Sequence, residues 1–332
     1  MDTPKKILLI RFKSIGDVLF TLPAAHVVRE AFPGARISFL VSKENATLLQ
    51  GFRDVDEVIT MDRALYRRKN PKAVVMETIS LLRRLRREHF SLVVDFQGYG
   101  ETAMLTWITR APERWGIVYQ PARGWAYTRC IRRDLQLHPA EWNLSLLQQC
   151  GLRSDQVRNE FFLPEPALVE ARQFCFEHGC DPARPMLYLQ PFTSAPHKNW
   201  PFENYLALAR FWRDHGLQVL FGGGPADSIH LKKAEAEGFA VATGIPRRID
   251  IALLKLSTLV IGGDTGFVHL AVALGTRVLM LIRWRGPGSP VPFQHSDWIV
   301  TPPSGQRVGK IELEQVVRAS VNALRECGLP VN

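Results

Sequence analysis

Residues 7–19 read Ile-Leu-Leu-Ile-Arg-Phe-Lys-Ser-Ile-Gly-Asp-Val-Leu, and the fold class can be inferred outward from them. The four leading apolar residues form a short continuous run, which is typical of a buried strand in a parallel sheet. A polar loop follows at once, and a helix is expected to begin at its end. Ligands of open α/β sheets bind outside the carboxyl ends of the strands, so this loop is predicted to face a ligand.

The loop contains Lys13, Ser14 and Gly16, followed by Asp17. Gly16 permits a close backbone approach, and a carboxylate in the first helical turn suits the helix dipole. The Ser14-x-x-Asp17 spacing is also a capping-box signal, and spacing alone favours this structural role over a catalytic one. The loop lacks the G-x-G-x-x-G pattern, which argues against a dinucleotide cofactor.

Short apolar runs alternate with amphipathic stretches along the rest of the chain. In the first half we expect strands at 7–10, 37–41, 58–61 and 92–96, and helices at 17–32, 45–51, 73–88, 101–110 and 142–150. Residues 115–138 are expected to be less regular. In the second half we expect strands at 186–190, 218–221, 259–261 and 277–282, and helices at 168–178, 202–215, 251–256, 268–274 and 311–324, with a further helix ending at Gly238.

The pattern breaks once, at residues 161–166, where Pro164 and Pro166 favour an extended connection. The sequence therefore predicts two doubly wound α/β domains, residues 1–160 and 161–332, with a cleft between them. The last helix is expected to pack back on the first domain.

Composition excludes several classes of protein. The 332 residues are 46% hydrophobic and 22% charged, which is ordinary for a globular chain, and no apolar run approaches the roughly 18–20 residues of a membrane span. The N-terminal apolar run is too short for a signal peptide. The five cysteines are odd in number and form no C-x-x-C pair, so neither a disulfide framework nor a zinc site is expected, and a reducing cytoplasm fits.

The net charge of +10 is concentrated in the first half, where residues 1–160 hold 25 basic and 17 acidic residues. Such an excess indicates an anionic partner, namely nucleic acid, a membrane surface or a phosphorylated acceptor; a solvated basic face is the plain alternative. Residues 63–87 alone hold nine basic residues against Glu77.

A second candidate segment, residues 190–201, follows a predicted strand of the second half. Its Thr193, Ser194 and Lys198 suit phosphate oxygens, because hydroxyls donate hydrogen bonds and lysine adds a mobile charge. An ordinary proline-punctuated loop is the alternative explanation.

A third segment, residues 260–271, runs from a strand through glycines into Asp264-Thr265-Gly266 and a helix that contains His269. Amides at a helix N-terminus bind phosphate, and the Asp264 carboxylate could hold sugar hydroxyls. Alternatively, Asp264 is an N-cap and His269 packs within the helix.

Together these segments resemble glycosyltransferase family nine, the bacterial ADP-heptose:lipopolysaccharide heptosyltransferases, which have the GT-B fold. The resemblance rests on residues 14–19 with 21–24, on 198–201, and on 263–266 with 269–271 and 275–276, in matching order over nearly the whole chain.

The resemblance implies an inverting transfer without a cofactor or a required metal. Asp17 would be the general base, with Lys13, Ser14 and Gly16 on the acceptor side. The donor, ADP-heptose or a related nucleotide-sugar, would be bound by the residues of the other two segments. These are Thr193, Ser194 and Lys198 at the diphosphate, Asp264 at the sugar, Thr265 and Gly266 near the phosphates, and His269 as a contact or a brace.

The acceptor implied by the resemblance is the phosphorylated, lipid-linked inner core of lipopolysaccharide. The protein would then be cytoplasmic and peripheral on the inner membrane. We expect salt-reversible association with anionic lipid, without insertion, through Arg67, Arg68, Arg83 and Arg84.

Residues 281–289 depart from the family's usual turn, which leaves the donor sugar and nucleotide open. A transferase with another donor or acceptor is the nearest alternative, and a nicotinamide-dependent oxidoreductase is a more distant one. No nucleic-acid reader motif is present, so nucleic acid is not an expected partner.

Overall fold

The computed structural model describes residues 3–65 and 71–330. The chain divides into two compact units, Met1–Phe162 and Leu163–Asn332, each with its own sheet and core. The expected boundary at 160/161 lies two residues before this division. Pro164 is the N-cap of the first helix of the second unit, Glu165–Glu177, and Pro166 lies in its first turn, so the extended connection expected over 161–166 ends at Pro164 and the helix begins before the expected residue 168.

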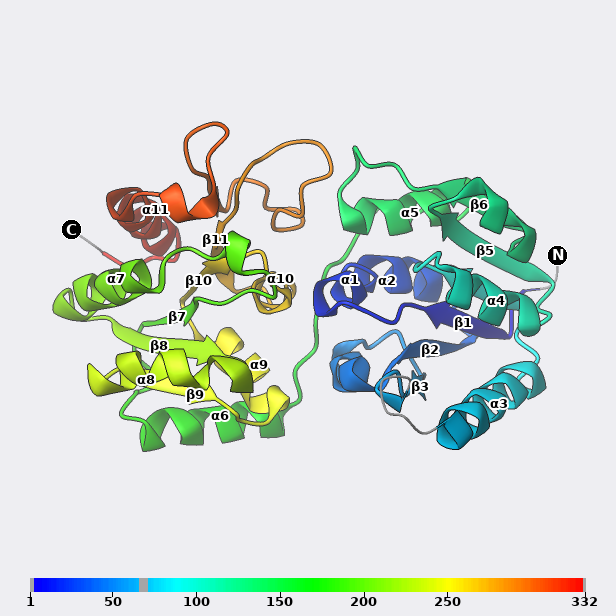
Figure 1. Ribbon diagram of the computed structural model, residues 1–332, viewed down its shortest axis with the longest axis horizontal. Coiled ribbons are helices and arrows are strands. Elements are labelled where there is room, and N and C mark those ends of the chain that lie inside the picture. The colour runs from blue at the N-terminus through cyan, green and yellow to red at the C-terminus, as the bar shows by residue number, and fades with distance from the viewer. Residues whose placement is uncertain (1–2, 66–70, 331–332) are drawn as a thin grey trace. The chain divides into compact units, whose positions relative to one another are not determined.

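The first unit contains one six-stranded parallel sheet in the order β3-β2-β1-β4-β5-β6 (Figure 1). Its strands are β1 (Lys6–Ile10), β2 (Arg36–Ser42), β3 (Glu57–Met61), β4 (Leu92–Asp95), β5 (Glu113–Val118) and β6 (Arg129–Arg132). Because β1 pairs with both β2 and β4, the direction of winding reverses there, and the loops after β1 and β4 leave the sheet side by side.

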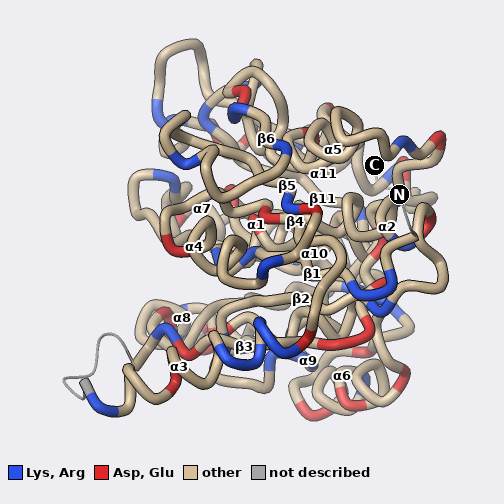
Figure 2. The backbone as a smooth tube through the Cα atoms, turned by 90° about the vertical axis from the view of Figure 1, so that its right-hand side faces the viewer, with Lys and Arg blue, Asp and Glu red and all other residues tan. Residues whose placement is uncertain are grey.

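Two layers of helices cover this sheet. Figure 2 shows α3 (Pro71–Arg87) and α4 (Gly100–Ile108) on one side of the sheet, and α2 (Leu22–Ala31) and α5 (Pro139–Gln149) on the other. The short 3-10 helix η3 (Pro121–Ala126) packs against α4 and extends the first layer. The expected helix at 45–51 is the 3-10 helix η1 (Lys43–Gly51).

Two expectations for the first unit were wrong. The helix expected over 17–32 is two helices, α1 (Ile15–Leu19) and α2, because Pro23 has no N–H to donate and is tolerated only in a first turn. Residues 115–138, expected to be irregular, contain most of β5, η3 and β6. The edge strand β6 is largely exposed and reads Arg-Cys-Ile-Arg, so it lacks the apolar run that marks a buried strand.

The second unit repeats the architecture with the strand order β12-β11-β10-β7-β8-β9. Its strands are β7 (Met186–Gln190), β8 (Gln218–Gly223), β9 (Ala240–Thr243), β10 (Leu259–Gly263), β11 (Arg277–Leu281) and β12 (Ile299–Val300). Its helices are α6 (Glu165–Glu177), α7 (Phe202–Asp214), α8 (Ser228–Ala236), α9 (Arg247–Leu256), α10 (Gly266–Ala273) and α11 (Leu313–Glu326). Strands β9 and β12 were not predicted, because β9 reads Ala-Val-Ala-Thr, without a run of large apolar residues, and the two residues of β12 are too short to show a pattern.

Two tryptophans join α11 to the core of the second unit. The indole N–H of Trp200 donates to the Ile311 carbonyl at 2.7 Å, and that of Trp212 donates to the Ser320 hydroxyl at 3.1 Å. Both indoles are fully buried, so their one polar atom needs such a partner. The expected packing of this helix on the first domain, and the cleft between the domains, stay predictions.

Within residues 3–65 and 71–330, no helix has the length and apolar character that crossing a membrane requires.

Candidate active site

Asp17 lies at the carboxyl end of a central strand of the first sheet. β1 ends at Ile10, and α1 begins five residues later, with Asp17 in its first turn. The flanking strands β2 and β4 place this loop at the switch point of the sheet, where doubly wound folds bind their ligands. The structure therefore locates the predicted catalytic carboxylate at the edge where chemistry is expected.

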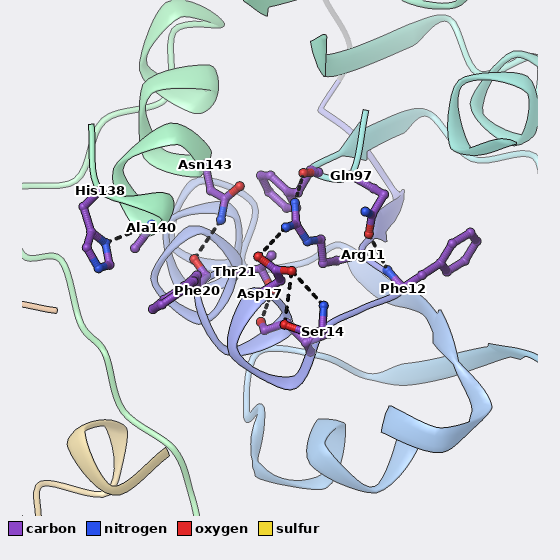
Figure 3. A network of polar contacts seen from close by, with 12 residues as sticks. Arg11, Phe12, Ser14, Asp17, Phe20, Thr21, Gln97, His138, Ala140 and Asn143 are labelled. Carbon is purple, nitrogen blue, oxygen red and sulfur yellow. Dashed lines mark hydrogen bonds and ion pairs between the residues drawn. The ribbon is translucent and has the colours of Figure 1, made fainter. Parts of the chain in front are cut away.

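Arg11 and Ser14 hold the Asp17 carboxylate from two sides (Figure 3). Arg11 Nη2 lies 2.8 Å from Asp17 Oδ1, while the backbone N–H and the hydroxyl of Ser14 lie 2.8 and 3.2 Å from Oδ2. The Arg11 side chain is 6% exposed and that of Asp17 is 35% exposed. The carboxylate therefore makes the predicted capping-box contact and still meets solvent.

Arg11 is itself fixed by the loop that follows β4. Its second terminal nitrogen, Nη1, donates to the carbonyl of Phe96, and the Phe12 N–H donates to Gln97 Oε1 at 3.1 Å. A buried guanidinium with two fixed acceptors has little freedom to move. The loops after β1 and β4 thus form one support beneath Asp17.

Asp95, at the end of β4, organises that second loop. Its carboxylate accepts hydrogen bonds from the N–H groups of Gln97 at 2.8 Å and Gly98 at 3.0 Å, and from the Tyr127 hydroxyl at 2.7 Å. Burial raises the pKa of Asp95, and these hydrogen bonds act against the rise. Sequence reasoning assigned no role to Arg11 or Asp95; the only available signal was a charged residue at the end of a buried strand.

The second unit brings together three of the predicted donor-site residues. Lys198 Nζ lies 2.7 Å from Asp264 Oδ2, and His269 Nε2 lies 3.2 Å from Asp264 Oδ1. Lys198 is about half exposed, whereas His269 is buried. Segments 190–201 and 260–271 therefore meet at the Asp264 carboxylate.

The environment of Asp264 keeps it ionised. Burial alone would raise its pKa, but the hydrogen bonds and positive charges of His269 and Lys198 outweigh burial and lower the pKa from 3.8 to about 2. At neutral pH this group is therefore a hydrogen-bond acceptor with no proton to donate.

Thr193 is held in place by Asn199. The backbone N–H and the hydroxyl of Thr193 lie 2.9 and 2.8 Å from Asn199 Oδ1, whereas Ser194 is exposed. A Cβ at Gly263 would lie 2.7 Å from the Thr193 methyl group, so a glycine is needed where β10 meets this loop. Asn199, which the sequence motif includes without a role, thus orients a predicted phosphate ligand.

Thr265 and Gly266 form the N-terminus of α10. Thr265 is the N-cap, and its side chain accepts a hydrogen bond from the Val268 N–H at 3.3 Å. The N-cap predicted as the alternative for Asp264 is therefore Thr265. The first amides of α10 lie at the carboxyl end of β10, which is a suitable place for phosphate.

The departing segment 281–289 leaves the sheet at the end of β11, the neighbour of β10. Trp284 is 49% exposed, and a Cβ on Gly286 would lie 2.3 Å from its ring. The indole therefore packs against the backbone of Gly286, in the segment that follows the carboxyl end of β11.

No group of three or more His, Cys, Asp and Glu side chains within residues 3–65 and 71–330 is arranged to hold a metal ion.

Known proteins match this chain over most of its length. A model of glycosyltransferase family 9 (heptosyltransferase) matches residues 78–310. The lipopolysaccharide core heptosyltransferase OpsX of Haemophilus influenzae is 23% identical over 309 residues, which cover 90% of this chain and 85% of that protein.

Two solved structures share the fold. A family 9 glycosyl transferase from Veillonella parvula superposes with a TM-score of 0.84 at 22% identity, covering 97% of this chain and 98% of that one. The E. coli heptosyltransferase WaaC with ADP gives 0.79 at 21% identity, covering 96% and 99%. These likenesses confirm the expected fold class, two doubly wound α/β domains of the GT-B type. Because the family model matches well over half of its length, the chain belongs to glycosyltransferase family 9, the heptosyltransferase family, and is a transferase.

Proposed function

We propose that this protein transfers a heptose from ADP-heptose to the inner core of lipopolysaccharide, with inversion at the anomeric carbon. The observation that carries the proposal is the family match over residues 78–310, with relatives named as lipopolysaccharide heptosyltransferases. The placement of Asp17 and Asp264 at the carboxyl ends of β1 and β10 supports it.

In the proposed reaction the acceptor hydroxyl oxygen attacks the anomeric carbon. The bond from that carbon to the β-phosphate oxygen breaks, and its electron pair leaves with ADP. Asp17 accepts the hydroxyl proton, which becomes acidic only as the new bond forms, so a carboxylate is a sufficient base. The partial exposure of Asp17 supports this role, because a fully enclosed cap could not reach a substrate.

On the donor side, Lys198 would exchange its contact with Asp264 for the diphosphate. Its half-exposed side chain allows this movement, and its charge would stabilise the leaving ADP. Ser194 and the first amides of α10 at Thr265 and Gly266 would donate further hydrogen bonds. Thr193 would join them by turning its hydroxyl proton from Asn199 Oδ1 to a phosphate oxygen.

Asp264, held as a carboxylate, would then accept hydrogen bonds from the sugar hydroxyls. The burial of His269 against Asp264 favours the role of a brace over that of a direct ligand. Lys13 and Ser14, both exposed, and the backbone at buried Gly16 would lie on the acceptor side.

We further propose that transfer needs neither a metal nor a cofactor, since Lys198 and the helix amides supply the positive field at the diphosphate. Turnover that persists in excess EDTA is the expected result, and restoration of lost turnover by a divalent cation would contradict it.

A peripheral contact with the anionic membrane surface completes the proposal. Arg83 and Arg84 are exposed on α3, and a basic side chain near anionic lipid contributes up to about 1 kcal/mol. Arg84 Nη2 lies 2.7 Å from Glu57 Oε1, so a contact of Arg84 with a lipid phosphate requires that pair to open. Arg67 and Arg68, which were expected to join them, lie outside the described residues.

Incubation with ADP-heptose and a deacylated inner-core acceptor tests the function directly. We expect one heptose per acceptor, the inverted anomeric configuration and equimolar ADP. Hydrolysis of ADP-heptose without transfer would contradict the proposal.

The exposed Trp284 in the departing segment favours one second candidate, transfer from another nucleotide-sugar. A thermal-shift panel of nucleotide-sugars separates the two, since a true ligand raises the melting temperature by mass action. Stabilisation by a different nucleotide-sugar, with none by ADP-heptose, would favour the second candidate.

A further inference from the structure

The outward side of α4 and η3 exposes three large apolar side chains, Met104, Trp107 and Trp125, which we call the tryptophan patch. Their exposed fractions are 54%, 54% and 56%. Met104 and Trp107 are three residues apart and share one face of α4. Trp107 and Trp125 meet edge to face, with ring centroids 5.8 Å apart. Contiguous exposed apolar surface of this kind marks an interaction site.

The tryptophan patch is held rigidly. Arg114 donates to the carbonyl of Ala126 at 2.9 Å, and Arg123 donates to the carbonyl of Gly98 at 3.1 Å. Tyr127, directly after η3, is buried and bonded to Asp95. The exposure of Trp125 is therefore a property of a fixed segment, with anchors on both sides of it.

The neighbouring helix α3 adds positive charge and further apolar surface. It packs against α4 on the same side of the sheet (Figure 2). Residues 71–87 hold five basic residues against Glu77. An open hollow of about 610 Å³ along α3 is lined by Met76, Ile79, Ser80, Arg83, Arg84, Arg87 and Glu88.

We propose that the tryptophan patch anchors the enzyme in the interfacial layer of an anionic membrane, with the α3 arginines on lipid phosphates beside it. Tryptophan favours the boundary between headgroups and acyl chains, and basic side chains next to apolar ones suit an anionic bilayer. The positive charge of α3 favours anionic lipid as the partner. A second copy of this chain would present the same basic face, and the two faces would repel each other.

The inference deepens the proposed peripheral contact, on which it rests, and replaces a purely salt-reversible contact by one with an apolar component. The patch is also linked to the support of the presumed catalytic carboxylate through one loop. The loop 96–98 bonds Arg11 through the carbonyl of Phe96 and η3 through that of Gly98. A lipid-linked acceptor held at this face would therefore lie near the support of Asp17.

Vesicle co-sedimentation of the full chain tests the anchor. Phosphatidylglycerol vesicles should bind the wild-type protein, and part of this binding should survive about 1 M salt, where the screening length is only about 3 Å. The double variant Trp107→Gln/Trp125→Gln should lose the salt-resistant part and bind at least about tenfold more weakly at low salt. Trp107→Phe/Trp125→Phe should restore much of it.

Phe176→Gln is the matched control, since Phe176 is 62% exposed on α6 of the second unit, and vesicle binding should not change. Unchanged kcat with the deacylated acceptor would show that the first unit of the glutamine variant is folded, because Asp17 lies in that unit. The KM of this variant should rise for the lipid-linked acceptor and stay constant for the deacylated one.

The anchor would be overturned if vesicle binding by the wild-type protein disappeared entirely at high salt. It would also be overturned if the glutamine variant bound vesicles as tightly as wild type. If the wild-type protein is a dimer, the glutamine variant is a monomer and both bind vesicles equally, the patch would instead be an interface with a second copy of the chain. If the wild-type protein transfers heptose to neither acceptor, the result would count against the proposed function and not against the anchor.

Discussion

Three carboxylates near the carboxyl ends of strands have different environments, and the differences indicate different roles. Asp17 is partly exposed and paired with Arg11, Asp264 is paired with Lys198 and His269, and Asp95 is enclosed by hydrogen-bond donors. Asp17 has the exposure that a base needs to reach its substrate, and Asp264 has the cationic partners that keep a sugar ligand ionised. Asp95 contacts only protein donors, as a structural carboxylate does.

Asp17→Asn should slow transfer by roughly 10²–10⁴-fold while the fold and donor affinity remain nearly intact. Asp17 is the N3 residue of the capping box, and asparagine keeps one oxygen to accept from the Ser14 N–H, while its amide nitrogen can replace neither the base nor the acceptor of Arg11. Single-turnover rates and calorimetry with ADP measure the two effects. A rate for Asp17→Asn within a few-fold of wild type would leave capping as the only role of Asp17.

Lys198→Ala and Asp264→Ala should affect the donor in different ways. A cation at the diphosphate contributes about 1.5–3 kcal/mol, so Lys198→Ala should weaken both ADP and the sugar nucleotide by roughly 10- to 150-fold. Asp264→Ala should weaken the sugar nucleotide more than ADP, because a carboxylate binds hydroxyls and repels phosphate. Calorimetry with ADP and with the sugar nucleotide measures both effects. If Asp264→Ala weakened the binding of the two ligands equally, the Asp264 carboxylate would have a purely structural role.

The lowered pKa of Asp264 predicts a pH dependence of stability. A carboxylate whose pKa is lower in the folded protein than in the unfolded chain stabilises the fold above its unfolded pKa. That contribution is lost as the pH falls from about 4 to about 2, and it amounts to about 2 kcal/mol. Urea unfolding over this range should therefore show a steeper loss for wild type than for Asp264→Asn. Parallel curves would refute the ion-pair account.

At the scale of elements, the loops after β1 and β4 act as one unit. Arg11 joins them through Phe96 and presents its other nitrogen to Asp17, while Asp95 shapes the second loop from below. The arrangement makes Arg11 a positioning residue for the proposed base.

Arg11→Met should lower kcat by about tenfold or more and leave KM for the donor nearly unchanged, because the carboxylate loses its orientation while the second unit keeps its ligands. Removing a buried charged donor should also lower the free energy of unfolding by about 1–3 kcal/mol. Arg11→Lys should recover part of kcat. A rise in donor KM with constant kcat would place Arg11 in donor binding instead.

At the scale of the whole molecule, the excess of positive charge lies in the unit proposed to bind the acceptor and not in the unit proposed to bind the donor. The first unit carries the basic excess and Asp17, and the second unit carries Lys198 and Asp264. Changes to the basic surface should therefore affect the acceptor and leave the donor unaffected.

Arg83→Gln/Arg84→Gln should reduce binding to anionic vesicles at low salt by roughly tenfold or more, since each charge is worth up to about 1 kcal/mol near the surface. It should also raise KM for a lipid-linked acceptor. Thermal shift with ADP should match wild type. Arg318→Gln/Arg325→Gln on α11 is the control, because it removes two exposed positive charges from the other unit; an equal effect there would show that only the total charge of the protein matters.

The sequence by itself determined the repeated α/β architecture, because a buried parallel strand is a local apolar run that can be read without its neighbours. It also located the loops of Asp17, Lys198 and Asp264, since ligand loops follow such strands in chain order. Strands β6, β9 and β12 escaped prediction because they lie at the edges of the sheets, where pairing with one neighbour substitutes for an apolar run. β5 escaped although it lies inside its sheet, because its sequence Glu-Arg-Trp-Gly-Ile-Val begins with two charged residues and includes a glycine.

Only the tertiary structure decided which side chains meet. Lys198 and Asp264 are 66 residues apart in the chain, and Arg11 and Phe96 are 85 apart. The parallel register of β7 with β10, and of β1 with β4, brings their carboxyl ends together and so creates these pairs. The tryptophan patch has the same origin, since Trp107 and Trp125 become neighbours only when α4 packs on η3. Local patterns encode elements, whereas contacts across a sheet depend on strand order, and no local pattern carries that information.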